Sequence, residues 1–84
     1  MQDAEVYKFQ YIRRQGLQRT YDVMLNVVQW ETGICAYEAW VHYAGTFKGS
    51  GLAYPLRASS VAEAATESRD RIENNIEDLA GVAE

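Results

Sequence analysis

The strongest constraint in the sequence is the alternation within residues 20–28, Thr-Tyr-Asp-Val-Met-Leu-Asn-Val-Val. The odd-numbered positions hold the largely apolar side chains of Tyr21, Val23, Leu25 and Val27. Successive side chains of a β-strand point to opposite faces, so this pattern predicts a strand that buries its odd-numbered face. Apolar segments on both sides of it can pair with it, which predicts a central position in a sheet.

Two further alternating segments flank this strand. Residues 5–12 and 34–43 alternate with the same period, and the central strand is expected to span residues 17–30. Gly16 and Gly33 mark short turns between them, which predicts an antiparallel meander. Residues 44–51 hold three of the six glycines and are expected to form a mobile loop. Residues 52–57 predict a short fourth strand, and Pro55 restricts it to an edge of the sheet.

The C-terminal part of the chain predicts one helix over residues 61–80. Ser60 precedes Glu63 by three residues, which is the spacing of a capping box, and Gly81 is a natural terminator. The expected apolar stripe of the helix consists of Val61, Ala65, Ser68, Ile72, Ile76 and Leu79. The stripe predicts a helix that buries one side.

The meander and the helix can bury their apolar sides only against each other. We therefore predict an α+β fold, a single domain over residues 1–84 in which three to four antiparallel strands form one layer and the C-terminal helix the other. The core is expected on the odd-numbered sheet face, at Phe9, Tyr21, Val23, Leu25, Val27, Tyr37, Ala39 and Val41.

Composition predicts a cytoplasmic protein. The single Cys permits no internal disulfide and fits a reducing compartment. No apolar run approaches the ~20 residues that span a bilayer, and the first five residues are unlike a signal peptide.

No catalytic, cofactor or metal site is predicted. His42 is the only histidine, and no Ser or Cys nucleophile is placed to use it. Cys35 falls on the predicted core face, where a free thiol behaves as a small hydrophobe. Gly45, Gly49 and Gly51 do not lead directly into a helix, as a phosphate-binding loop requires. We therefore expect a protein without enzymatic activity.

The even-numbered sheet face predicts a binding surface, because it carries more apolar surface than solubility needs. The expected partner-binding residues are Trp30, Trp40, Met24, Val28, His42, Arg13 and Arg14. The two tryptophans are the expected anchors, and the two arginines would steer a partner. Three coverings remain open: the glycine-rich segment with Phe47 and Leu52 or the N-terminus, a second copy in a homodimer, or another macromolecule.

Charge is divided unevenly along the chain, whose net charge is −4. Four basic residues and no acid lie between Tyr7 and Thr20, whereas seven acids and two arginines lie between Val61 and Glu84. The basic first hairpin and the aromatic sheet face allow an alternative function, binding of nucleic acid as in an antitoxin-like regulator. The low isoelectric point, about 4.9, disfavours direct binding to nucleic acid.

Two short segments resemble known families. Residues 61–65, Val-Ala-Glu-Ala-Ala, open a helix as in small antitoxin domains of the HicB type. The segment Arg71-Ile72-Glu73-Asn74, followed by Ile76 and Glu77, is similar to the tail helix of a phage-encoded anti-CRISPR inhibitor of a type I-F surveillance complex. The second resemblance implies a phage or mobile-element inhibitor that binds and blocks a host defence or nucleic-acid-handling complex. A protein partner is thus the leading expectation, with no membrane association.

Overall fold

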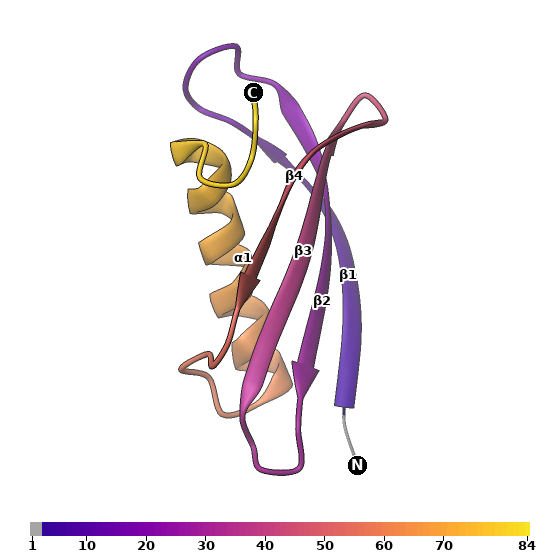
Figure 1. Ribbon diagram of the computed structural model, residues 1–84, viewed down its shortest axis with the longest axis vertical. Helices are drawn as coiled ribbons and strands as arrows, with labels where there is room; N and C mark the ends of the chain where they lie inside the picture. Colours follow the sequence, from indigo (N-terminus) through magenta and orange to yellow (C-terminus); the bar gives the residue numbers. More distant parts are fainter. Residues whose placement is uncertain (1–2) are drawn as a thin grey trace.

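The computed structural model describes residues 3–84 as one four-stranded antiparallel sheet with one helix packed on it. The strands are β1 (Asp3–Ile12), β2 (Thr20–Gln29), β3 (Cys35–Tyr43) and β4 (Thr46–Ala53), and the helix is α1 (Val61–Asp78). The principal extents are 41 × 21 × 17 Å, and α1 lies along one side of the sheet (Figure 1). This confirms the predicted α+β two-layer fold with a C-terminal helix.

The strands follow one another across the sheet in chain order, β1-β2-β3-β4. Leu25 of β2 lies opposite Tyr7 of β1 and Ala39 of β3, so the alternation of residues 20–28 sets the register of the whole meander. Cross-strand partners in an antiparallel pair share a face, and a shift by one residue would exchange the two faces. The odd-numbered residues of β1, β2 and β3 therefore lie together under α1.

The buried core occupies this odd-numbered face, as predicted. Its sheet members are Tyr21, Val23, Leu25, Val27, Cys35, Tyr37, Ala39 and Val41, and α1 contributes Ala64, Ile72 and Ile76. Phe9 of the edge strand β1 is partly buried against this cluster. The buried residues of the helix are the small Ala64 and Ser68 in its first half and the larger Ile72 and Ile76 in its second half.

The glycine-rich segment is a strand, and the prediction of a mobile loop over residues 44–51 is wrong. Only Ala44 and Gly45 form the turn, and β4 begins at Thr46. Pro55 lies beyond the end of β4 rather than within a strand. The glycines serve close approach: a Cβ added at Gly51 would come within 2.9 Å of Ile72 Cδ1. A side chain at Gly51 would require Ile72 to shift, and a Cβ at Gly49 would meet the backbone oxygen of Gly81 at 2.1 Å.

The helix begins at the predicted cap and ends two residues early. The Ser60 side chain accepts a hydrogen bond from the backbone N–H of Glu63 at 3.2 Å. At the other end Leu79 takes the left-handed conformation, with φ of 53°, ahead of the predicted terminator Gly81. Leu79 is consequently exposed and leaves the apolar stripe.

The C-terminal segment returns to the edge of β4. Ser50 N–H donates to the Gly81 carbonyl at 3.2 Å, and Ala83 N–H donates to the Lys48 carbonyl at 2.7 Å. Val82 is buried in the core. The last residues thus cover part of one sheet edge, whereas β1 forms the other edge.

Candidate functional site

The candidate site is the sheet face that lies away from α1, here called the open face. Its members come from even-numbered positions of β1, β2 and β3 and from β4: Ala4, Val6, Lys8, Gln10, Asp22, Met24, Asn26, Val28, Ala36, Glu38, Trp40, His42, Phe47, Ser50 and Leu52. No element between residues 3 and 84 packs over this face, because α1 packs on the opposite one. The open face therefore combines an apolar surface with direct access from solvent.

Trp40 lies in the middle of the open face. Its cross-strand neighbours are Met24 on β2 and Ser50 on β4. Trp40 is half-buried and Met24 is exposed. A large indole with a cross-strand neighbour on each side has the placement expected of an interface anchor.

A hollow lies on each side of Trp40 along the strands. The first, about 380 Å³, is lined by residues that include Lys8, Asp22, Met24 and His42. The second, about 270 Å³, lies toward the other end of the sheet and is lined by Asn26, Val28, Trp30, Ala36, Tyr37, Glu38, Leu52 and Tyr54. The two hollows give the open face relief into which side chains of a partner can fit.

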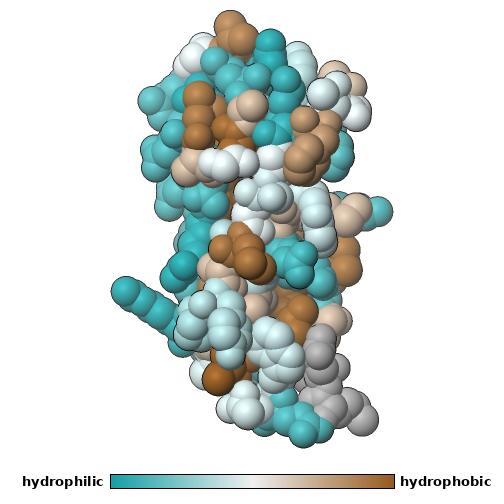
Figure 2. Space-filling view, in the orientation of Figure 1, coloured by the Kyte–Doolittle hydropathy of each residue, from teal (hydrophilic) through white to brown (hydrophobic). Residues whose placement is uncertain are grey.

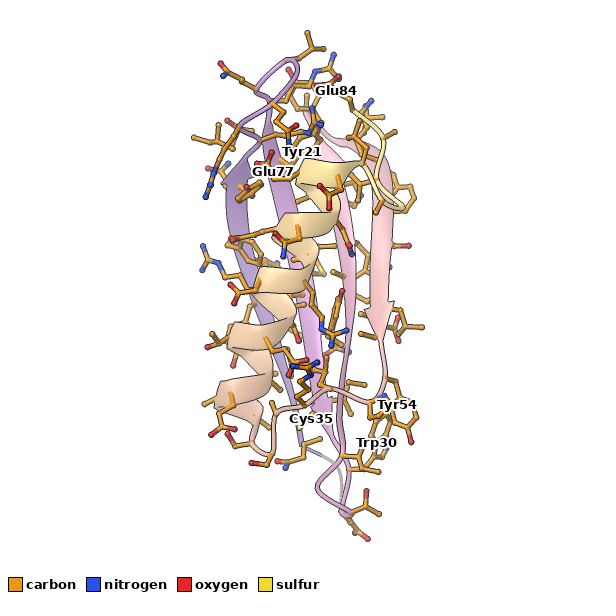
Figure 3. The ribbon with its side chains drawn as sticks, turned by 90° about the vertical axis from the view of Figure 1, so that its left-hand side faces the viewer. Tyr21, Trp30, Cys35, Tyr54, Glu77 and Glu84 are labelled. Atoms are coloured by element: carbon orange, nitrogen blue, oxygen red, sulfur yellow. The ribbon has the colours of Figure 1, made fainter. Side chains whose placement is uncertain are left out.

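Trp30 sits beside the second hollow rather than beside Trp40. Its ring packs edge-to-face on Tyr54, with centroids 5.2 Å apart and planes at 86°. Figure 3 shows this pair at one end of the molecule, far from Glu77 and Glu84 at the other end. Val28 lines the same hollow. The predicted residues Trp30, Val28, Met24, Trp40 and His42 thus lie along one face of the sheet.

The structure excludes a covering of this face by the glycine-rich segment. Phe47 and Leu52 belong to β4 and remain 56% and 71% exposed, so the glycine-rich segment does not fold over Trp40. Covering by residues 1–2 falls outside the described part of the chain. Figure 2 shows hydrophobic side chains spread along the molecule, with hydrophilic ones between them.

Arg13 does not lie at the surface, where steering of a partner was expected. Its side chain is 8% exposed and binds the C-terminal end of α1. Nε donates to the Ile76 carbonyl at 3.0 Å, Nη2 to the Glu77 carbonyl at 2.7 Å, and Nη1 to the Glu84 carboxylate at 2.9 Å. The last turn of α1 holds no basic residue of its own, so Arg13 supplies the positive charge that helix carbonyls favour. We call Arg13, Glu77 and Glu84 the hairpin–helix clamp.

Glu77 completes this clamp from the helix side. Its carboxylate accepts hydrogen bonds from the Tyr11 hydroxyl, from the Arg14 backbone N–H at 2.9 Å and from Gln15 Nε2 at 3.0 Å. These bonds, Tyr11 first, lower the pKa of Glu77 from 4.5 to about 2. The Arg14 side chain remains exposed at the tip of the first hairpin. The low pKa of Glu77 is thus explained by its hydrogen bonds to the first hairpin.

His42 and Cys35 lie at opposite ends of β3, apart from each other. The His42 ring packs edge-to-face on Phe47, with centroids 5.5 Å apart. Cys35 is fully buried, and this burial raises the pKa of its thiol, which opposes thiolate formation. Among residues 3–84 no three metal-ligating side chains are grouped, and no helix there has the length and apolar character to cross a membrane.

Sequence reasoning missed several members of the open face. Val6 and Leu52 lie in one row of cross-strand neighbours with Asn26 and Glu38, and both are strongly exposed. Val6 was overlooked because the first strand was predicted from the aromatic residues at its odd-numbered positions. Leu52 was obscured because the fourth strand was placed six residues too late. Even-numbered apolar residues on the edge strands are the signal that would have found them.

No protein-family model, curated protein or solved structure matches the chain.

Proposed function

We propose that this protein is a non-enzymatic interaction module that binds a protein partner through the open face. The observation that carries the proposal is the solvent-accessible apolar surface around Trp40, with Met24, Val6 and Leu52 exposed on strands of one sheet. An apolar face on one layer of a two-layer domain is typical of an interface.

The charges of the open face favour a protein over nucleic acid. Lys8 is its one lysine or arginine, whereas Asp22 and Glu38 are both exposed on it. A face of this kind lacks the positive surface that phosphate backbones require. Arg13, one of the four cations of the first hairpin, is already engaged with α1. These observations count against the antitoxin-like alternative.

A more specific form of the proposal is an inhibitor from a phage or mobile element that blocks a host nucleic-acid-handling complex. The resemblance of residues 71–77 to an anti-CRISPR tail helix supports this form. Addition of the chain to a purified type I-F surveillance complex tests it, with binding of a labelled DNA target as the measurement. Unchanged target binding at saturating chain contradicts the inhibitor form and leaves the interaction module standing.

The interaction module itself is tested with two leucine substitutions of equal chemistry. Leu52→Lys places a charge on the open face, and Leu17→Lys places one on the first hairpin, where Leu17 is 63% exposed. Both variants should keep the wild-type circular dichroism. We expect proteins retained by the immobilised wild-type chain, including the chain itself, to be retained by Leu17→Lys and lost by Leu52→Lys. Equal retention by both variants would contradict the proposal.

Nucleic-acid binding is tested separately. A fluorescent oligonucleotide titrated with the chain at several salt concentrations should show no tight binding. Sub-micromolar affinity with a steep dependence on salt would instead favour the antitoxin-like alternative.

A further inference from the structure

We propose that the partner of the open face is a second copy of this chain, packed sheet against sheet about a two-fold axis parallel to the strands. This inference rests on the proposed function, because it assigns a partner to the same surface. The product is a β-sandwich with the two sheets inside and the two helices outside. Its evidence is the self-complementarity of the open face under that axis.

The axis runs between β2 and β3, so that β1 faces β4 of the second copy and β2 faces β3. Residues that form one row across the sheet then meet in reverse order. In the row Lys8, Met24, Trp40, Ser50, Met24 meets the second Trp40 and Lys8 meets the second Ser50. Apolar surface covers apolar surface, and the lysine meets a hydroxyl.

The neighbouring rows match equally well. In the row Val6, Asn26, Glu38, Leu52, Val6 meets the second Leu52, and the Asn26 amide meets the second Glu38 carboxylate.

On the other side of Trp40 lies the row Gln10, Asp22, His42, Phe47, in which the Asp22 carboxylate meets the second His42 imidazole. None of these three rows brings two like charges together. Such charge matching sets the register of an interface.

The alternative two-fold axis, perpendicular to the strands, fits poorly. Placed on the row of Trp40, it brings Lys8 against the second Lys8. Placed on the row of Val6, it brings Glu38 against the second Glu38. Like charges in a desolvated interface oppose association, so the axis parallel to the strands is the one that the surface favours.

The open face is also large enough for a specific dimer. Four strands at a spacing of about 4.8 Å, each about eight residues long at about 3.4 Å per residue, cover roughly 500 Å² on each copy. The total of about 1,000 Å² lies at the lower limit for specific interfaces. Sheets that pack face to face lie about 10 Å apart, which the side chains of Trp40 and Met24 can fill.

The experiment combines sedimentation with crosslinking of cysteine variants. Val6→Cys and Leu52→Cys are made as separate proteins, and a bismaleimide with a reach of about 8 Å is added to each alone and to their mixture. Val6 and Leu52 of one chain lie three strand spacings apart, about 14 Å, and the axis separates each from its own copy by a similar distance. Cys35 is fully buried and shielded from the reagent.

We expect a dimer in sedimentation and a crosslinked dimer in the mixture only. We also expect Leu52→Lys to raise the dimer dissociation constant at least about tenfold, whereas Leu17→Lys leaves it unchanged. A chain that stays monomeric at the highest soluble concentration overturns the inference, as does crosslinking of Val6→Cys alone.

A monomeric chain that loses another bound protein on Leu52→Lys overturns the dimer and keeps the proposed function. If the chain is monomeric and the Leu52→Lys variant retains the same proteins as the wild type, both the dimer and the proposed function are overturned.

Discussion

Replacement of Arg13 by alanine should destabilise the fold more than replacement of any other charged residue of the first hairpin. The guanidinium is buried and joins the hairpin to both the end of α1 and the C-terminal Glu84. Its loss leaves the Ile76 and Glu77 carbonyls and the Glu84 carboxylate without these donors.

The magnitude follows from these contacts. A hydrogen bond to a charged group contributes about 1.5–3 kcal/mol, and breaking a buried ion pair costs about 3–5 kcal/mol. Glu84 is only partly covered, and water can reach the helix end after truncation, so we expect a loss of about 2–4 kcal/mol. For a domain of 84 residues this lowers the melting temperature by roughly 10–25 °C.

Thermal and urea unfolding followed by circular dichroism measure this loss. Arg14→Ala is the matched control, because the hydrogen bond of Arg14 to Glu77 uses its backbone N–H, and its stability should stay within about 0.5 kcal/mol of wild type. Arg13→Lys keeps the charge without the planar fork and should recover about half of the loss. If Arg13→Ala and Arg14→Ala unfold alike, the hairpin–helix clamp does not stabilise the fold.

Four further changes probe the core, the clamp and the edge of β4. Leu25→Ala removes a central core side chain that is 1% exposed and should cost about 2–5 kcal/mol in urea unfolding. Ser68→Ala should raise stability by about 1 kcal/mol, because the buried hydroxyl has no hydrogen-bond partner among the described residues. Glu77→Gln should lower the melting temperature at pH 7. The difference from wild type should shrink as pH falls from about 4.5 to about 2, since a lowered pKa gives stabilisation that acid removes. Gly49→Ala would place a Cβ 2.1 Å from the Gly81 carbonyl oxygen, so hydrogen exchange at the Ser50 and Ala83 amides should accelerate.

The sequence predicted the fold well where periodicity carries the information. Alternation in residues 20–28 fixes which side of β2 is buried, and cross-strand pairing extends that choice to Tyr7 and Ala39. The capping box at Ser60 likewise fixes the start of α1 from local chemistry alone. Prediction failed at β4, where the glycines of residues 49 and 51 looked like a flexible loop. Glycine is needed at these two positions because of tertiary contacts, since the C-terminal segment and α1 approach the strand there.

The sequence predicted which sheet face carries the candidate site, but it predicted the individual residues of the site less well. Alternation that buries Val23 and Leu25 necessarily exposes Met24, and the same reasoning placed Trp40 beside it. Arg13 could not be assigned in this way, because its partners lie more than sixty residues later in the chain. A basic residue in a hairpin tip has the same sequence signature whether it meets solvent or the end of a helix.

The single helix of this domain covers one side of the sheet and leaves the open face uncovered. Arg13 fixes the first hairpin to the C-terminal end of α1, and hydrogen bonds at Ser50 and Ala83 pair the segment after the helix with β4, so this end of the helix layer is tied to the sheet at two places. The helix packs on one side of the sheet, whereas no helix or strand within residues 3–84 covers the side that carries Trp40. A small domain buries a limited share of its apolar surface alone. In the proposed dimer, a second copy over the open face would bury further apolar surface without lengthening the chain and would thereby stabilise the fold.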